Sequence, residues 1–390
     1  MRLAIEKKDL IHQIQHLATI VPTKNISPIL INYLIEVDAD TNMVQITASD
    51  LEITVIVQFP ANVSESGATA IAARHFNEII SSMPDQVINI FKMDEIVKIQ
   101  CGKIDFSLMC ADPTLFPVLP AKTLDNALTF DAALFNRMVS KTVFAVSTDV
   151  NRAVLTGVCW TIKPEFHQMA ATDGRKVAEI KVFDSPLANQ APTETNTEDN
   201  IFTETPNIET IERVIPIKTL SFLQKIIESG ITELKVVIES NRILFAYGKY
   251  LIFTKIIEHK YPDYHKAFMP DLPNTVIIDK DAIRTTIRRV ALVAPDDNLR
   301  IKLEIDLDRF EINTVNRDTG EAKQVMENYS YQGSPTSVSV NYKYMVSILD
   351  AIDTDKVKIT LGTSRDPLMF YNESLPEKQE LTFLLMPLRS

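Results

Sequence analysis

Asp105-Phe-Ser-Leu-Met109, Ile252-Phe-Thr-Lys-Ile256 and Thr382-Phe-Leu-Leu-Met386 repeat one pattern in this chain, and a proline follows each of them. Working outward, three earlier stretches also match one another, and each opens a segment with apolar residues at helical spacing: residues 5–10, 130–135 and 278–283. Repetition of a whole segment fixes the architecture before any single motif is considered. The pattern predicts three similar domains rather than one large one.

We place these domains at residues 1–122, 128–268 and 272–390. The middle repeat is the longest, and its excess lies between Lys181 and Arg213, where no basic residue occurs. That stretch is rich in Pro, Thr, Asn and acidic residues and cannot bury a core. We expect an exposed acidic insertion at about 184–212. A disordered tether, a decoration of the rim and a partner site all remain open for it.

Each repeat divides into two halves in which a helix precedes strands. In the first repeat, Leu10, Ile14, Leu17 and Val21 fall at helical spacing. Alternating apolar residues between polar turns predict strands at 29–37, 44–48, 53–59, 87–91, 96–100 and 104–109. Further helices are expected at 74–83, 134–146, 220–227, 283–293 and 344–352. The fold class is therefore α+β, with six helices and mainly antiparallel hairpins.

Composition favours a soluble protein of the cytoplasm. Hydrophobic residues make up 45% of the chain, yet no run approaches the ~18 to 20 apolar residues of a membrane helix. The N-terminus lacks the apolar segment of a signal peptide. Cys101, Cys110 and Cys159 are too few and too irregularly spaced for a disulfide framework or a zinc site. We interpret them as buried thiols in a reducing compartment.

Motifs for catalysis and for cofactors are nearly absent. His12 and His16 have the spacing of two metal ligands on one helix, but Gln13 stands where a zinc protease has its glutamate, so exposed polar histidines are the favoured interpretation. The 9 glycines form neither a dinucleotide-binding nor a P-loop pattern. Ala171-Thr-Asp-Gly174 is typical of an ordinary turn. We predict no catalytic residue, no metal and no cofactor.

Cations recur on the helix faces that point away from the core. Arg137 and Lys141 are four residues apart, as are Arg284 and Arg288, and Lys218 and Lys225 share one face. For a single helix, a solvated face is the simpler explanation. Repetition across equivalent helices in a chain of net charge −11 instead indicates attraction for DNA confined to one surface.

Several short segments together resemble one family, the bacterial DNA polymerase III beta subunit, which is the replicative sliding clamp. The segments occur in the family's order along the whole chain: Ser27-Pro-Ile-Leu30, Ser49-Asp-Leu-Glu52, Ala73-Arg74, Phe116-Pro117, Leu155-Thr-Gly157, Ala171-Thr-Asp-Gly-Arg-Lys-Val-Ala178, Tyr261-Pro-Asp-Tyr264 and Leu385-Met-Pro-Leu-Arg389. The resemblance implies a three-domain clamp fold that forms a ring-shaped homodimer. It implies a processivity factor that encircles duplex DNA without reading its sequence. The alternative is a non-DNA scaffold or interaction protein with the same fold.

The resemblance also implies a surface for the DNA backbone. One basic position of the family lies in the loop after the first helix, and helix geometry adds the others. The candidate DNA-binding residues are Lys24, Arg74, Arg137, Lys141, Lys218, Lys225, Arg284 and Arg288.

A second implied site is a peptide-binding cleft between the second and third domains. The matching positions are Leu155, Thr172, Gly174, Arg175, Lys176, Val177, Pro262, Lys266, Ala267, Asn341, Tyr344, Leu384, Leu385, Met386, Pro387, Leu388 and Arg389. The sequence departs from the commoner pattern of the family at Val154, Arg175, Lys176, Val177, Arg365 and Pro367. The shape and charge of the cleft are therefore expected to differ.

The implied partners are double-stranded DNA, a second copy of the chain and proteins that carry short linear motifs. Among the latter are the DNA polymerase III alpha subunit, the clamp loader, other polymerases, ligase and mismatch-repair proteins. Phe106, Leu292 and Val293 match positions that pack across the dimer joint. Because no nucleotide-binding loop is found, a separate ATP-driven loader is expected to open the ring.

Overall fold

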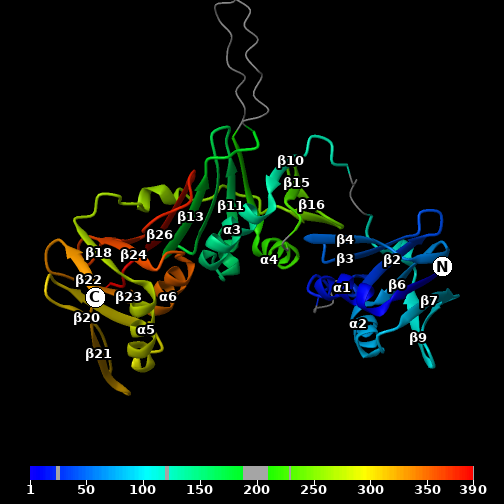
Figure 1. Ribbon diagram of the computed structural model, residues 1–390, viewed down its shortest axis with the longest axis horizontal. Helices are drawn as coiled ribbons and strands as arrows, with labels where there is room; N and C mark the ends of the chain where they lie inside the picture. The colour runs from blue at the N-terminus through cyan, green and yellow to red at the C-terminus, as the bar shows by residue number, and fades with distance from the viewer. Residues whose placement is uncertain (23–26, 119–122, 188–209, 228–229, 390) are drawn as a thin grey trace, which may run out of the picture. The chain divides into compact units, whose positions relative to one another are not determined.

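The computed structural model describes residues 1–22, 27–118, 123–187, 210–227 and 230–389 (Figure 1). Contacts divide the chain into two compact units, Met1–Asn136 with Lys218–Ile256 and Arg137–Ile217 with Ile257–Ser390. The described residues contain six α-helices: α1 Lys7–Leu17, α2 Ala73–Ser82, α3 Ala132–Thr142, α4 Ile217–Ile226, α5 Lys280–Val290 and α6 Tyr342–Ala351. All six predicted helices are therefore present.

The first unit contains one sheet of 13 strands in the order β10-β15-β16-β17-β4-β3-β2-β6-β9-β8-β7-β1-β5. Its strands are β1 Arg2–Glu6, β2 Asn32–Asp38, β3 Met43–Ser49, β4 Ile53–Pro60, β5 Asn62–Glu65, β6 Gly67–Ala72, β7 Val87–Met93, β8 Ile96–Cys101, β9 Ile104–Ala111, β10 Leu128–Asp131, β15 Glu233–Ile238, β16 Arg242–Tyr247 and β17 Tyr250–Lys255. The first and middle repeats join at a seam within this sheet, the antiparallel strand pair β4–β17, in which Thr54 faces Phe253.

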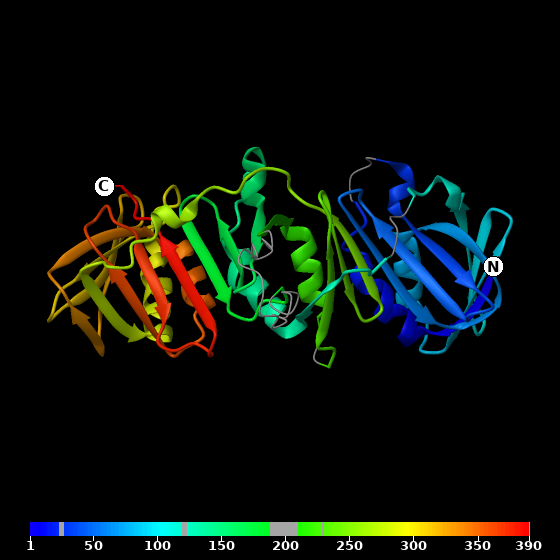
Figure 2. The ribbon, with the colours of Figure 1, turned by 90° about the horizontal axis from the view of Figure 1, so that it is seen from above.

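The second unit contains two sheets. The larger has the order β14-β11-β12-β13-β26-β25-β24-β18-β22, and the smaller has the order β21-β20-β19-β23. The strands are β11 Gly157–Ile162, β12 His167–Thr172, β13 Lys176–Val182, β14 Ile211–Pro216, β18 Asn274–Asp279, β19 Arg300–Ile305, β20 Phe310–Asn316, β21 Gly320–Met326, β22 Tyr329–Gln332, β23 Thr336–Asn341, β24 Lys356–Leu361, β25 Leu368–Asn372 and β26 Gln379–Leu385. Although β13 and β26 are distant in sequence, they lie side by side and pair from Lys176–Leu385 to Val182–Gln379 (Figures 1 and 2).

The helices begin where the repeated sequence predicts. Asp279 caps α5 by accepting a 2.7 Å hydrogen bond from the backbone nitrogen of Ala282, and Asp131 accepts one of 2.6 Å from that of Leu134 in α3. In α1, the predicted stripe of Leu10, Ile14 and Leu17 is buried. Because apolar residues three and four apart lie on one helix face, each helix packs that face against its sheet.

The repeated stretches at the end of each domain are offset by one residue in the middle repeat. Gly102 and Gly248 occupy equivalent hairpin turns, β8–β9 and β16–β17, and have φ angles of +58° and +53°. Counting from these turns, Phe106 corresponds to Ile252 rather than to Phe253. Successive strand residues face opposite sides, so Phe253 instead packs in a separate cluster with Ile56 and Leu244.

Two further expectations need correction. Residues 28–31 form a short 3-10 helix, so β2 begins only at Asn32. Pro28 at the start of this turn lacks an N–H group for a sheet and has a fixed φ angle. Cys110 is only partly buried, whereas Cys101 and Cys159 are buried. The domain boundaries 1–122, 128–268 and 272–390 stay a prediction.

Lys24 and most of the acidic insertion, residues 188–209, lie outside the described residues. The flanks of the insertion are described, and they are β13 and β14, which both belong to the larger sheet of the second unit. In the described part of the chain, no helix is long and apolar enough to cross a membrane.

Candidate functional site

A hollow of about 300 Å³ opens in the second unit beside the seam between β13 and β26. Residues from four separate segments line it: Arg152, Leu155, Thr172, Gly174, Arg175, Val177, Pro262, Tyr264, Ala267, Leu384 and Met386. Most of its wall is apolar side chain, and backbone and hydroxyl groups of the β12–β13 turn stand at one side. Such a groove can hold a few apolar side chains of a peptide.

The floor of this cleft consists of two small apolar clusters. Leu155 packs with Cys159, Val214 and Tyr261, and burial raises the pKa of the Cys159 thiol to about 12. Val177, Met369 and Leu384 form the second cluster. Tyr264 packs against both clusters. The floor is therefore one continuous apolar surface.

Tyr264 is held in place by polar contacts behind the cleft. Its hydroxyl donates a 2.6 Å hydrogen bond to Glu179 Oε2 and accepts one of 3.2 Å from Gln168 Nε2. Burial, together with the nearby Glu179 carboxylate, raises the pKa of Tyr264 far above its ordinary value. His265 stacks on its ring and lies 3.1 Å from the same Glu179 oxygen. The ring of Tyr264 is thus a fixed wall.

The turn between β12 and β13 is ordered by its own side chains. Asp173 Oδ1 accepts hydrogen bonds from the backbone nitrogens of Arg175 and Lys176, and Gly174 donates to Thr172 Oγ1 at 3.0 Å. Gly174 has a φ angle of +88°, and a Cβ atom there would lie 3.0 Å from Arg152 Nη2. Glycine is needed here for both conformation and space.

The C-terminal segment forms another wall, beside the β12–β13 turn, and is held by backbone hydrogen bonds. Met386 donates to the carbonyl oxygen of Arg175 at 2.7 Å, and Leu388 donates to that of Ser339 at 2.8 Å. Arg300 Nη2 donates to the carbonyl oxygen of Arg389 at 2.6 Å. Met386 also borders a second hollow of about 430 Å³, which is lined by Ser364, Arg365, Met386, Pro387, Leu388 and Arg389.

The structure brings together many of the residues expected in the peptide-binding cleft. The first hollow includes Leu155, Thr172, Gly174, Arg175, Val177, Pro262, Ala267, Leu384 and Met386, and the second adds Pro387, Leu388 and Arg389. The remaining expected residues support these walls or lie outside them. They are Lys176, Lys266, Asn341, Tyr344 and Leu385.

Their contacts explain why these five do not line the hollows. Lys176 is buried, pairs with Asp173 at 3.0 Å and lies over the Tyr344 ring. Asn341 caps α6, and Leu385 is buried in β26. Lys266 is exposed and pairs with Asp263. Sequence reasoning missed Arg152 altogether, whereas Tyr264 stood in a quoted motif without being assigned to the cleft.

The cations proposed for DNA differ in what they contact. Lys141 is buried, with its ammonium bound to Asp353 and to the carbonyl oxygen of Ala351. Arg137 binds the same Asp353 at 2.7 Å, and Lys218 pairs with Asp50. These three cations join helices to neighbouring segments, which corrects the expectation that they lie on free helix faces. Burial and an anionic partner leave Lys141 little capacity for a phosphate.

Of the remaining described cations of this set, Arg74, Lys225 and Arg288 are exposed, whereas the Arg284 side chain is only 29% exposed and pairs with Asp281 and Asp350. The side chain of Arg74 is 85% exposed and pairs with Glu78 on the same helix. Arg284 and Arg288 both reach Asp350, and Arg288 is 56% exposed. Lys225 is exposed near the end of α4. Exposed ion pairs of this kind are weak and can exchange partners.

The predicted dimer joint coincides with two incomplete strand edges. Among the described residues, 104–109 of β9 pair only with β8, because β6 pairs with β9 only at Cys110 and Ala111. Ile104, Phe106 and Met109 are exposed along this edge. In the described part of the other unit, β21 pairs only with β20, and the neighbouring Leu292 is 85% exposed. Unpaired apolar edges of this kind invite a partner strand.

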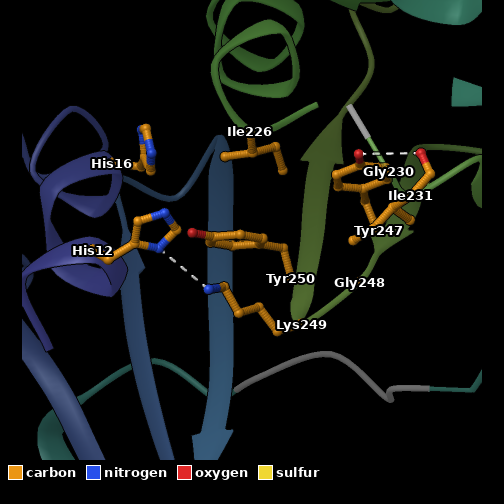
Figure 3. A pocket seen from close by; sticks show the side chains of 9 residues that line it. All are labelled: His12, His16, Ile226, Gly230, Ile231, Tyr247, Gly248, Lys249 and Tyr250. Atoms are coloured by element: carbon orange, nitrogen blue, oxygen red, sulfur yellow. Dashed lines mark hydrogen bonds between the residues drawn. The ribbon is translucent and has the colours of Figure 1, made fainter. Parts of the chain in front are cut away.

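His12 and His16 border a separate pocket of about 300 Å³ in the first unit, between α1, α4 and the β16–β17 turn (Figure 3). Their ring centroids are 6.3 Å apart, and Lys249 Nζ lies 3.4 Å from His12 Nδ1. An ammonium group beside an imidazole opposes the binding of a metal cation there. Among the described residues, no group of three or more His, Cys, Asp or Glu side chains could hold a metal.

Family models of the DNA polymerase III beta subunit match most of the chain. The N-terminal domain model matches residues 1–120, the central domain model matches 199–263 and the C-terminal domain model matches 266–389. The chain belongs to the DNA polymerase III beta subunit family. The predicted family, its three-domain clamp fold and its role as a polymerase processivity factor are thereby confirmed.

Individual members of the beta subunit family agree with this assignment over their full length. The chain is 27% identical to the beta sliding clamp of Staphylococcus aureus over 400 residues, with 100% of both chains covered. The crystal structure of the beta subunit from Streptococcus pyogenes has a TM-score of 0.88 at 24% identity and covers 100% of both chains. The sliding clamp from Bacillus subtilis has a TM-score of 0.88 at 23% identity, with 100% and 99% covered. At these identities, the two structural matches establish the fold.

Proposed function

We propose that two copies of this chain close a ring around duplex DNA and that the cleft of the second unit tethers replication proteins to that ring. The observation that carries the proposal is the convergence of Leu155, the β12–β13 turn and the C-terminal segment on one apolar hollow. The cleft gives the clamp a way to hold a polymerase, and the ring gives it a way to stay on DNA.

Ring closure is supported by the pattern of seams within the chain. In each repeat, the third strand after the first helix is β4, β13 or β21, and the last strand after the second helix is β9, β17 or β26. Within the chain, β4 pairs with β17, and β13 pairs with β26. This leaves β21 and β9 as the one strand of each kind without such a pairing among the described residues. We propose that β9 of one copy pairs with β21 of the other. Phe106 would then lie close to Leu292 and Val293, which removes exposed apolar surface from water.

For DNA, the proposal rests on the accessible cations. Arg74, Lys225 and Arg288 would attract the phosphate backbone, because exposed cations exchange their carboxylate partners at little cost. Arg284, whose side chain is 29% exposed, would add to the same positive field. Lys24 remains a candidate, although it lies outside the described residues. Arg137, Lys141 and Lys218 would act indirectly by fixing the positions of the helices. Contact with phosphates alone would allow the ring to slide without reading bases.

For partners, we propose the polymerase III alpha subunit, the clamp loader, other polymerases, ligase and mismatch-repair proteins, all through short linear motifs. A peptide of a few residues fits the size of the hollow and its mixture of apolar wall and backbone donors. The proposed compartment is the cytoplasm, where the bacterial chromosome is replicated. No chemical step is assigned to the chain itself.

Topological retention tests the ring directly. The clamp is loaded by a compatible clamp loader with ATP onto nicked circular DNA, freed of loader by gel filtration in high salt, and the DNA is then cut once. We expect the clamp to remain on the circle and to leave after linearisation. A clamp that dissociates from the circle in high salt binds the DNA surface and does not encircle it.

A further inference from the structure

Four arginines surround the two adjoining hollows of the cleft. Arg152 and Arg175 border the first hollow, and Arg365 and Arg389 border the second. They come from four different segments, and Met386 is common to both hollows. Each of the two hollows is therefore lined by two arginines.

None of these four arginines forms an ion pair with a carboxylate of the described residues. Arg152 uses Nη1 to donate to the backbone carbonyl of Asp173 at 3.1 Å. The helix cations differ: Arg74, Arg137, Lys218 and Arg288 each lie against an Asp or Glu side chain. Positive charge at the cleft is thus left available in a chain whose net charge is −11.

The carboxylates of the same turns are engaged elsewhere. Asp173 pairs with Lys176 and accepts backbone hydrogen bonds inside its own turn. Asp366 accepts from the backbone nitrogen and the hydroxyl of Thr363, both at 2.7 Å, and these bonds lower its pKa. Neither acid neutralises the neighbouring Arg175 or Arg365. A bound ligand is left to supply the opposite charge.

We propose that the cleft of this clamp selects acidic linear motifs, in which Asp or Glu residues flank the apolar anchor. This inference rests on the proposed tethering function of the cleft. The apolar side chains occupy the hollow over Val177 and Leu384, and flanking carboxylates reach Arg175 on one side and Arg365 on the other. Guanidinium groups suit this role because their planar fork can bind a carboxylate through two hydrogen bonds. Complementary charge adds specificity to the contact made by the apolar groups.

The test compares three peptides that share one apolar anchor with a glutamine and differ only in their two flanking residues, which are Asp, Asn or Lys. Their affinities for the full-length clamp are measured by calorimetry at low and at high salt. We expect the Asp peptide to bind about tenfold more tightly than the Asn peptide at low salt, equivalent to about 1.4 kcal/mol. The Lys peptide should bind most weakly, and the differences should shrink as salt screens the charges.

Two variants locate the effect. The double variant Arg175→Gln/Arg365→Gln should lose the charge preference and bind the Asp and Asn peptides equally. Arg289→Gln makes the same change at an exposed arginine of α5 and should retain the preference.

Two results would overturn the inference while the cleft stands: equal binding of the three peptides to the parent, or a preference that survives in the double variant. Failure of all three peptides to bind would remove the tethering cleft itself, and the inference with it.

Discussion

The guanidinium of Arg152 lies across Gly174, close enough that a Cβ atom on that glycine would be 3.0 Å from Nη2. The same guanidinium donates to the carbonyl oxygen of Asp173. A residue of the 3-10 segment Val150–Thr156 thus fixes the β12–β13 turn from outside, and the two together shape one end of the cleft.

Gly174→Ala should therefore weaken both the fold and peptide binding. A φ angle of +88° costs an alanine about 1 to 2 kcal/mol, and the new methyl group displaces Arg152. Urea unfolding measures the first effect and peptide titration the second. The matched control is Gly230→Ala, where φ is +122° but the added Cβ would lie more than 4 Å from every described residue apart from its chain neighbours. It should lose stability alone, and a loss of peptide affinity there would contradict this explanation.

Deletion of residues 386–390 should abolish most peptide binding. Met386 borders both hollows, and the backbone bonds to Arg175 and Ser339 hold the segment as a wall. Loss of about 3 kcal/mol of contact weakens binding by about a hundredfold. Calorimetry with full-length and truncated protein checks this, and sedimentation should show that both remain dimeric. Equal affinities for the two proteins would mean that the cleft is wrongly assigned.

Leu292→Asp should convert the clamp to monomers. The side chain is 85% exposed in the single chain, so the change should not disturb the fold of the monomer. In the proposed dimer, the carboxylate would be buried without a partner, at a cost of several kcal/mol. Sedimentation measures the outcome. Leu307→Asp, at another exposed leucine, should stay dimeric, and an undiminished dimer of the Leu292 variant would remove this joint from the proposal.

The contact of Lys141 with Asp353 should contribute to stability in a pH-dependent way. Although partial burial opposes it, hydrogen bonds from Lys141 and Arg137 lower the pKa of Asp353. A depressed pKa in the folded state gives stability that is present above the unfolded pKa of ~3.9 and is lost as pH falls through the folded pKa.

Lys141→Met should accordingly lower the free energy of unfolding at pH 7 by about 1 to 2 kcal/mol, since Asp353 keeps Arg137 and some solvent. The loss relative to the parent should diminish below about pH 4. Urea unfolding at several pH values tests this, with Lys225→Met as an exposed control. If the difference in unfolding free energy between Lys141→Met and the parent stayed constant down to pH 2, the contribution of Lys141 would not depend on ionisation of Asp353.

Reversal of exposed helix cations should weaken retention on DNA and leave folding intact. Lys225→Glu/Arg288→Glu changes two accessible cations of α4 and α5. Loading on nicked circles should fall, and the salt dependence of direct DNA binding should become shallower because fewer phosphates are contacted. Lys235→Glu/Lys356→Glu alters the net charge equally on two strands and should behave as the parent. Equal losses in both variants would indicate a general charge effect.

Local patterns were sufficient for the helices because burial of Leu10, Ile14 and Leu17 depends only on spacing along one helix. Local patterns were insufficient to find the ion-pair partners of cations that the helical spacing places away from the core. Nothing near Lys141 in the sequence indicates Asp353, which reaches it through the packing of α3 and the end of α6. Arg152 was missed for the same reason, because its role depends on a contact with the carbonyl oxygen of Asp173, 21 residues later in the chain.

The middle repeat also shows a limit of pattern matching. Phe253 lies one residue beyond Ile252, the position that is equivalent to Phe106 in the first repeat. A shift of one residue places a side chain on the opposite face of a strand. More of the cleft could be expected from the sequence, since most residues of its wall lie in short segments that resemble the family. Tyr264 stood in such a segment, but only the packing of the two floor clusters revealed its role.

The seams β4–β17 and β13–β26 run through the middle repeat and assign its halves to different compact units. A domain excised at the sequence boundaries would therefore lose partners along two hydrogen-bond ladders and expose both edges to aggregation. Strands that are hydrogen-bonded in one unit should unfold together, so a calorimetric scan should resolve two cooperative transitions and not three. The segment that repeats in the sequence is thus not the segment expected to unfold as a unit.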